Sequence, residues 1–203
     1  MNLIEITHPA GTLTDDQRRS IATSIIANLL VEPDAPPEAI ERAGRTTHVW
    51  FREATGWTSG GPADALDAVT PIVATITVPQ AWLSDLTRHA MSAVRAALVR
   101  HLGPASLSPE STWVNVVGIP DGSIGMHGRP TTSSDLVRYL TQDVQLDTTV
   151  DLPDGVVVDP VCGMRVRLGP NAVTLRHDGT TIGFCATGCR SVYAQDHQLT
   201  VPA

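Results

Sequence analysis

The stretch LIEITHPAGTLTDDQRRSIATSIIANL, residues 3–29, predicts how the first two thirds of the chain fold. Its opening, residues 3–6, has the alternation typical of a strand. Thr14 followed by Gln17 has the pattern of a capping box, which predicts that a helix begins here. That helix has an apolar stripe at helical spacing, formed by Ile21, Ala22, Ile25, Ile26 and Leu29. We therefore expect a strand followed by an amphipathic helix.

The residues that follow complete one structural unit and then repeat it. A Pro-rich connector leads to a short helical segment at 37–43, a strand at 47–51 and a glycine-rich turn at 56–61. Roughly seventy residues further on, the same order returns. It consists of a strand at 71–78, a helix capped by Ser84 and Asp85, a strand at 112–117 and a glycine-rich turn at 121–128.

Two tandem β-α-β units predict an α+β fold class, with a four-stranded sheet and both helices packed on one face. The other face of the sheet would expose valine, isoleucine and tryptophan side chains unless another subunit covers it. After the second glycine-rich turn, residues 131–135 predict the cap of a further short helix at 136–140.

This layout resembles the tautomerase superfamily, in particular its longer members with two fused β-α-β units. The resemblance covers residues 1 to about 130 and rests on the layout and on the helix starts Leu13-Thr14-Asp15 and Leu83-Ser84-Asp85. It implies a homotrimer formed through the N-terminal domain. It also implies an N-terminal proline as catalytic base or nucleophile, but Asn2 stands at that position.

Asn2 changes the expected chemistry because a general base needs a free lone pair placed against the substrate. Asparagine does not reproduce the rigid secondary amine of proline, so we expect a tautomerase-like scaffold without standard tautomerase chemistry. The catalytic residues, if there are any, stay unknown. Side chains that could line a pocket, each more often a solvated charge or a strand residue, are Arg45, His48, Arg52, Trp57, His127 and Arg129.

The three cysteines of the chain lie near its end as Cys162-x22-Cys185-x3-Cys189. An odd number of cysteines cannot close into intramolecular disulfides only. A redox pair would favour the spacing Cys-x-x-Cys, which is one residue shorter than the spacing here. Thiolates are the ligands that Zn²⁺ and Cu(I) prefer. The cluster therefore predicts a metal site, in which a helical turn places Cys185 and Cys189 on one face.

The cysteine segment resembles the YHS domain, a relative of the treble-clef-like TRASH metal-binding modules. The resemblance covers roughly residues 157–197 and rests on the opening DPVCGM (159–164), a hairpin around Gly179, the FC-x3-C pair and Tyr193. It implies Cys162, Cys185 and Cys189 as metal ligands. Zn²⁺ is the expected ion, with Cu⁺ or another thiophilic metal as alternatives.

The fourth ligand is left open by the sequence. A structural zinc site needs about four donors, and three are cysteines. The remaining candidates are His177, His197, Asp159, Asp178 and a water molecule. An open fourth position would suit transfer or sensing of the ion better than a purely structural role.

The net charge and the apolar segments of the chain limit its expected partners and location. A net charge of −7 argues against a nucleic-acid partner, because such surfaces neutralise phosphates. No apolar run is long enough for membrane insertion and no secretory signal is visible, so we expect a cytoplasmic protein. The predicted domains are a tautomerase-like domain (1–145), a polar linker (146–156) and a metal-binding domain (157–203).

These observations predict a metal-binding protein in which the larger domain serves as a trimeric scaffold. The alternative is an isomerase or dehalogenase-like enzyme of the tautomerase type, which would use a base other than proline and carry an accessory metal module. A third possibility is a regulator that reports metal occupancy to a protein partner. Loss of the ion on Cys185→Ala distinguishes metal binding from a purely enzymatic role.

Overall fold

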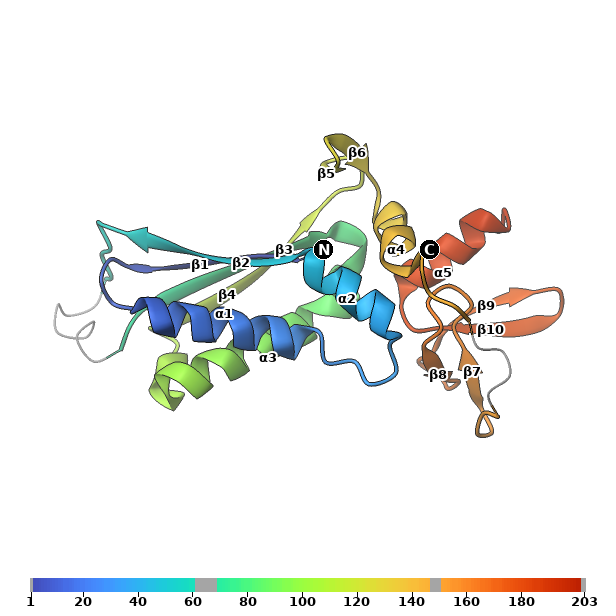
Figure 1. Ribbon diagram of the computed structural model, residues 1–203, viewed down its shortest axis with the longest axis horizontal. Coiled ribbons are helices and arrows are strands. Elements are labelled where there is room, and N and C mark those ends of the chain that lie inside the picture. The colour runs from blue at the N-terminus through green and yellow to red at the C-terminus, as the bar shows by residue number, and fades with distance from the viewer. Residues whose placement is uncertain (1, 61–68, 147–150, 202–203) are drawn as a thin grey trace. The chain divides into compact units, whose positions relative to one another are not determined.

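The strand predicted at the start of the chain is β1 (Asn2–Pro9), the second strand of a four-stranded sheet with the order β2-β1-β3-β4. The computed structural model describes residues 2–60, 69–146 and 151–201 (Figure 1). The chain forms two compact units. Unit 1 comprises residues 1–31, 46–78 and 86–118, and unit 2 comprises residues 32–45, 79–85 and 119–203.

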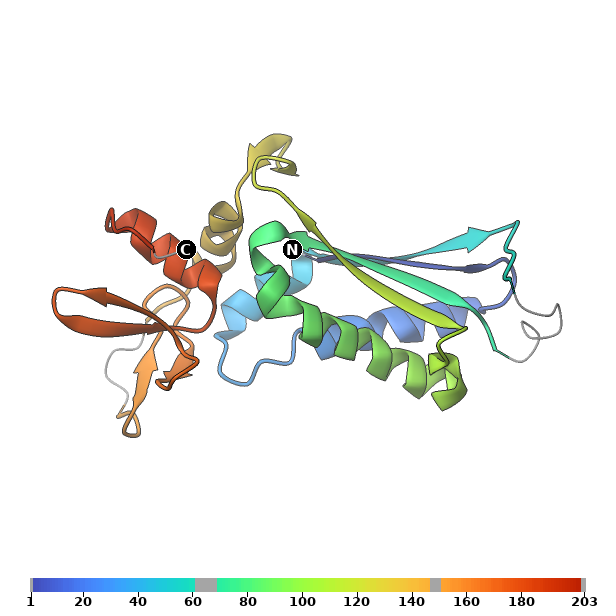
Figure 2. The same cartoon turned by 180° about the vertical axis from the view of Figure 1, so that it is seen from behind.

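The sheet of unit 1 is mixed. β1 pairs in parallel with β2 (Thr47–Ala54) and antiparallel with β3 (Ile72–Pro79), and β4 (Thr112–Ile119) follows at the edge. Helices α1 (Asp15–Leu29) and α3 (Leu83–Leu102) lie on one face of it (Figures 1 and 2). The 3-10 helix η3 (Pro104–Leu107) connects α3 to β4. The predicted fold class is therefore confirmed.

The core between the sheet and the helices is almost entirely aliphatic. Its fully buried side chains come from both strands and helices: Ile4, Ile6, Ile21, Ile25, Ile72, Ile76, Val94 and Leu98. The period of two along β1 and the helical spacing along α1 bring these side chains to one layer. At about 25 cal/mol per Å² of apolar surface removed from water, such burial is the main stabilising contribution to unit 1.

The start of α1 agrees with the sequence prediction, whereas the start of α3 differs from it. The Thr14 side chain caps α1, and the Thr14 amide donates a hydrogen bond to Oε1 of Gln17 at 2.9 Å. The predicted cap at Ser84 is wrong, because α3 already begins at Leu83. The 3-10 helix η2 (Gln80–Trp82) runs directly into α3, so Ser84 lies within its first turn.

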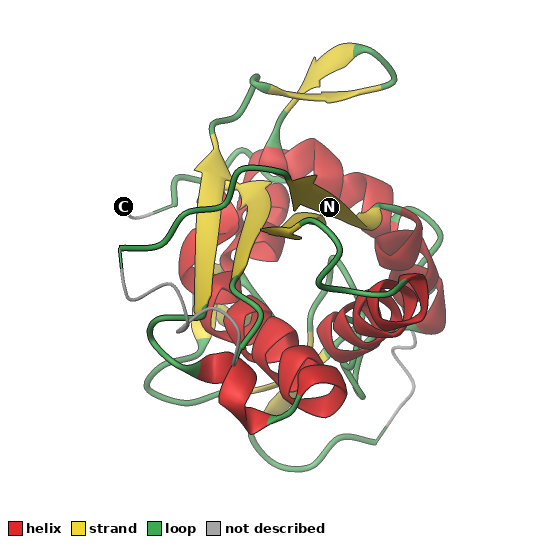
Figure 3. Ribbon diagram, turned by 90° about the vertical axis from the view of Figure 1, so that its left-hand side faces the viewer, coloured by secondary structure: helices red, strands yellow, loops and turns green. Residues whose placement is uncertain are grey.

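Unit 2 is built from short elements, whose types are coloured in Figure 3. Helix α2 (Pro37–Arg45) agrees with the predicted segment, and α4 (Ser133–Thr141) has the expected cap, with Thr132 and Asp135 forming a capping box. Two hairpins pair β5 (Ile124–Met126) with β6 (Arg129–Thr131) and β7 (Val156–Val158) with β8 (Arg165–Arg167). A third hairpin, β9 (Val173–His177) with β10 (Thr180–Phe184), leads to α5 (Thr187–Asp196).

The segments of unit 2 that are distant in sequence are joined by polar contacts. Arg42 of α2 forms an ion pair with Asp143, and Asp85 accepts hydrogen bonds from the backbone and the hydroxyl of Thr187, the latter at 2.7 Å. The units are discontinuous in sequence, whereas the predicted domains 1–145 and 157–203 are continuous, and those limits stay a prediction.

Parts of two predicted segments lie outside the described residues, namely Gly61 of the first glycine-rich turn and 147–150 of the linker. Within the described ranges, no helix has both the length and the apolar character needed to cross a membrane.

Candidate metal centre

Three thiols from two distant stretches of unit 2 come together. The Sγ atoms of Cys162 and Cys185 are 3.4 Å apart, and those of Cys185 and Cys189 are 3.6 Å apart. All three cysteines are free thiols. Together with a carboxylate oxygen of Asp159, their ligand atoms lie within 4.8 Å of one another. Over the described residues, this is the one group of three or more such side chains that could hold a metal ion.

A tight turn presents Cys162. Its backbone closes through two hydrogen bonds, from Asp159 N to Met164 O at 2.8 Å and from Gly163 N to Asp159 O at 2.9 Å. Gly163 has φ 76°, a left-handed conformation that glycine adopts without the steric cost of a side chain. This turn directs Cys162 to a buried position.

Cys185 and Cys189 lie where a strand meets a helix. Cys185 follows β10 directly, Ala186 is the N-cap of α5, and Cys189 lies in the first turn of α5. The prediction that one helical turn carries both residues is therefore wrong, because the helix begins two residues after Cys185. The strand-to-helix junction nevertheless brings the two sulfurs into contact.

Asp159 joins the two cysteine segments. The residue is completely buried, and its Oδ1 accepts hydrogen bonds from the amides of Val161 at 2.8 Å and Cys162 at 3.3 Å. Its Oδ2 accepts from the amide of Cys185 at 2.8 Å. One carboxylate thus satisfies buried backbone donors of both segments, which would otherwise cost stability.

The three thiols and Asp159 affect one another's pKa values. Hydrogen bonds from the Cys185 and Cys189 thiols lower the pKa of Cys162. The hydrogen bond to Cys162 raises the pKa of Cys185, and hydrogen bonds to both other cysteines raise the pKa of Cys189. Burial, followed by the nearby Cys162 charge, raises the pKa of Asp159.

Apolar side chains enclose the sulfurs. Val137, Leu175, Phe184 and Val192 form the buried cluster that includes Cys162 and Cys189, with Trp82 packed against it. A side chain on Gly183 would place its Cβ 2.7 Å from Val157 and 2.9 Å from Leu168, so these side chains would have to shift to admit it. The apolar side chains around the sulfurs limit solvent access to them, and low solvent access strengthens the electrostatic interaction between an ion and thiolates.

The other predicted ligand candidates gather elsewhere in unit 2. His177 forms a 2.8 Å hydrogen bond through Nδ1 with the Tyr193 hydroxyl, and its ring lies 4.9 Å from that of His197. Asp178 is exposed and lies beside His177. Of the predicted protein donors, Asp159 is the one that the structure brings to the three thiols.

Asn2 and two of the arginines considered for a catalytic pocket have ordinary structural partners. Asn2 donates its amide to Thr46 O at 3.2 Å and its side chain to Thr47 Oγ1 at 3.3 Å. Arg45 pairs with Glu41, and Arg52 pairs with Glu5. His48 and Trp57 belong to unit 1, on β2 and in the loop after it. His127 and Arg129 line a shallow pocket at the β5–β6 hairpin.

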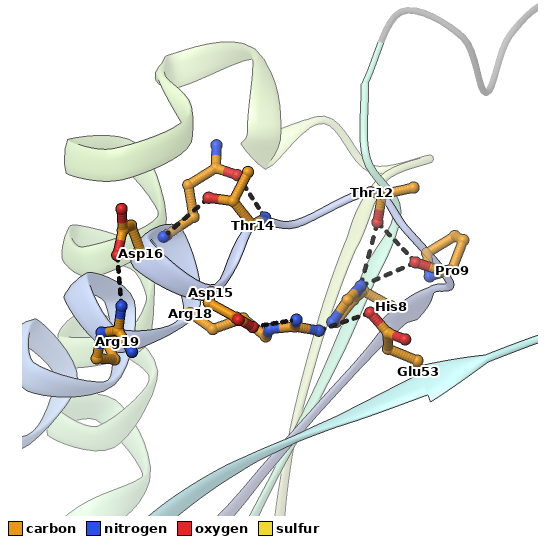
Figure 4. Close-up of polar contacts among 10 residues, drawn as sticks. His8, Pro9, Thr12, Thr14, Asp15, Asp16, Arg18, Arg19 and Glu53 are labelled. Carbon is orange, nitrogen blue, oxygen red and sulfur yellow. Dashed lines mark hydrogen bonds and ion pairs between the residues drawn. The ribbon is translucent and has the colours of Figure 1, made fainter.

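A buried histidine in unit 1 was not identified from the sequence (Figure 4). His8 is completely buried, and its Nδ1 lies 2.9 Å from Pro9 O and 3.1 Å from Thr12 Oγ1. Its Nε2 has no hydrogen-bond partner among the described residues. The strand alternation of β1, which places His8 on the same face as Ile4 and Ile6, is the signal that predicts its burial.

Comparisons with known proteins give partial likenesses only. No protein-family profile and no curated protein sequence matches the chain. Similar solved structures include native Ps01740 (24% identity, 61% of this chain and 99% of that chain, TM-score 0.46). Others are an asymmetric trimer of R7 fused 4-OT (16%, 63% and 94%, 0.47) and the macrophage migration inhibitory factor-like protein of Entamoeba histolytica (12%, 64% and 97%, 0.44). The α+β architecture itself is given by the sheet order and helices of this chain.

Proposed function

We propose that this chain is a metal-binding protein whose ion is held by the thiolates of Cys162, Cys185 and Cys189. The observation that carries the proposal is the convergence of three sulfurs from two segments, with neighbouring Sγ atoms 3.4 and 3.6 Å apart. A positive ion replaces the thiol protons and is bound by all three sulfurs.

Asp159 is the proposed fourth donor. An ionised carboxylate has about four lone-pair positions, and three are used by the amides of Val161, Cys162 and Cys185. The remaining position on Oδ2 allows one bond to an ion. Three thiolates and one carboxylate form a tetrahedral set suited to Zn²⁺, whereas Cu⁺ would use the three sulfurs alone.

Unit 1 is proposed to serve as a trimeric scaffold of the tautomerase type. Large apolar side chains are exposed on its strands, including Trp50 on β2 and Trp113 and Val117 on β4, with Trp113 64% exposed. Trp50 lies on one edge strand of the sheet and Trp113 and Val117 on the other, and exposed apolar side chains of this kind are candidates for contacts with other subunits. The proposal predicts a trimer in sedimentation equilibrium, and a monodisperse monomer at micromolar concentration would contradict it.

The metal-binding proposal is tested by elemental analysis. Protein purified under reducing conditions without added metal, or reconstituted anaerobically with Zn²⁺, is expected to hold about one tightly bound ion per chain. Cys185→Ala should lose that ion. Ser191→Ala, which alters the same helix but no ligand, should retain it. Failure of the unaltered protein to bind Zn²⁺ or Cu⁺ under these conditions would exclude the proposed centre.

A further inference from the structure

We infer that His177 and His197 form a second, weaker ion site at the surface of unit 2, which exchanges an ion with the thiolate centre. This inference rests on the proposed function. The two imidazole rings come from different elements, and their centres lie 4.9 Å apart at an interplanar angle of 59°. Two imidazoles that bind one ion through nitrogens about 2.0–2.1 Å away bring their ring centres to roughly 4.5–5.5 Å, so the spacing fits.

Two rigid turns hold the histidines in place. His177 ends β9 at a two-residue hairpin turn, in which Asp178 has φ 49° and Gly179 has φ 76°, as a type I′ turn requires. His197 is the C-cap of α5. Hydrogen bonds from Leu199 N to Ala194 O and from Gln198 N to Gln195 O form a Schellman motif after it. Neither imidazole therefore depends on a mobile loop for its position.

Tyr193 contacts both histidines and can fix the tautomer of His177 that binds a cation. Its hydroxyl lies 2.8 Å from Nδ1 of His177, so the tautomer in which Nδ1–H donates leaves the Nε2 lone pair available for an ion. The Tyr193 ring also lies 4.1 Å from the His197 ring. The carboxylate of Asp178 is 3.6 Å from Nε2 of His177, and His197 stands at the negative end of the α5 dipole.

Helix α5 links the histidine pair to the thiolate centre, because it contains Cys189 and has His197 as its C-cap. Cys189, Tyr193 and His197 follow one another at four-residue spacing, which places them along one side of α5. A pocket of about 480 Å³ is lined by Tyr193 and His197 and also by Pro160 and Val161, the two residues before Cys162. The pocket thus lies between His197 and the segment that leads into Cys162.

Two protein nitrogens with water in the other positions bind a borderline divalent ion weakly and release it readily. The site would therefore be empty after purification and occupied only when free ion is present. The class of ligand is a divalent ion that accepts imidazole, such as Zn²⁺, Co²⁺ or Ni²⁺. Ions that require only oxygen ligands, such as Mg²⁺ and Ca²⁺, should not bind at this pair.

Anaerobic titration of the full-length, metal-free protein with Co²⁺ tests the inference, because cobalt bound to sulfur shows charge-transfer absorption in the near ultraviolet. The first equivalent should produce this absorption, and a weaker second equivalent should add visible bands without it. His197→Ala should abolish the second phase and leave the first unchanged. Tyr193→Phe, which removes only the hydrogen bond to His177, should weaken the second ion by about tenfold.

The control is His127→Asn, which alters an exposed histidine at a left-handed turn position of the same unit, where asparagine is tolerated. It should leave both phases unchanged. A second phase that survives His177→Ala and His197→Ala together would overturn the inference, as would a titration that ends after one equivalent. Absence of the sulfur absorption in the first phase would instead overturn the thiolate centre, so the two failures are distinguishable.

Discussion

Unit 1 and unit 2 are stabilised in different ways. Unit 1 has eight-residue strands and a buried layer of isoleucine, valine and leucine. Unit 2 has strands of three to five residues, and its core contains two buried cysteines and the completely buried Asp159. An aliphatic core needs no ligand, whereas buried thiols and a carboxylate are stabilised when they bind an ion. The comparison therefore predicts that the ion contributes to the stability of one unit only.

Metal removal should give the largest effect. Stripping the ion with a chelator is expected to abolish hydrogen-exchange protection of residues 157–199, because binding free energy at a thiolate site is also folding free energy. Protection in β1 and β3 should remain. Hydrogen exchange with mass spectrometry measures both regions in one sample. Equal loss of protection in the two units would contradict the proposed difference.

Replacing Asp159 should be the next largest effect. Asp159→Ala leaves the amides of Val161, Cys162 and Cys185 without their acceptor, and is expected to destabilise unit 2 by about 2–4 kcal/mol. Asp159→Asn keeps one acceptor oxygen and should cost less. Urea unfolding followed by the signals of unit 2 measures both variants. An unchanged midpoint for Asp159→Ala would show that the carboxylate does not hold the cysteine segments.

A glycine of β10 offers a test of packing beside the centre. Gly183→Ala would force a methyl group to within 2.7 Å of Val157 and should destabilise unit 2 by about 1–3 kcal/mol. Gly169→Ala is the matched control, because nothing lies within 4 Å of its Cβ position. Denaturant unfolding of the two variants should differ. If Gly183→Ala and Gly169→Ala unfold at the same denaturant concentration as the unaltered protein, the packing around Gly183 is looser than its Cβ distances indicate.

Acid should act on the ion affinity before it acts on unit 1. Hydrogen bonds within the cluster and burial raise the pKa values of Cys185 and Cys189, and an ion binds their thiolates only by displacing the thiol protons. Affinity for Zn²⁺ should therefore rise with pH between about 6 and 8. Competition with a chromogenic chelator at several pH values measures this slope. Affinity that does not depend on pH would mean that the thiols are already ionised.

The smallest effect is expected at the surface of unit 1. A hydrogen bond from Arg18 lowers the pKa of Glu53, as it does for Asp15. A lowered folded-state pKa stabilises the fold above the unfolded value and loses that contribution as pH falls through the folded value. Between pH 5 and 3, unit 1 should lose slightly less stability in Arg18→Gln than in the unaltered protein. Thermal unfolding at each pH measures the difference.

Local patterns predicted much of the fold. The alternation of β1 and the capping box of Thr14 and Gln17 depend on neighbouring residues, and the structure confirms both elements. The three cysteines do come together, but not on the single helical turn that their spacing predicts. Contacts between distant residues were not predictable in the same way. Asp159 was one of several possible ligands, and neither its hydrogen bond to the Cys185 amide nor the packing of Trp82 against the cysteine cluster leaves a local signal.

The discontinuous composition of unit 2 has a consequence for how the chain could be divided. The polypeptide passes between the units after Val31, Arg45, Val78, Asp85 and Gly118. A fragment cut out at residue 157 would lack Trp82, Val137 and the Asp85 acceptor that contacts Thr187. Residues 157–203 therefore do not contain all the side chains that pack against the cysteine segment, and recombination of these residues alone would lose those contacts. Exchange between unrelated proteins would have to carry its supporting loops, so the two units are expected to be inherited together.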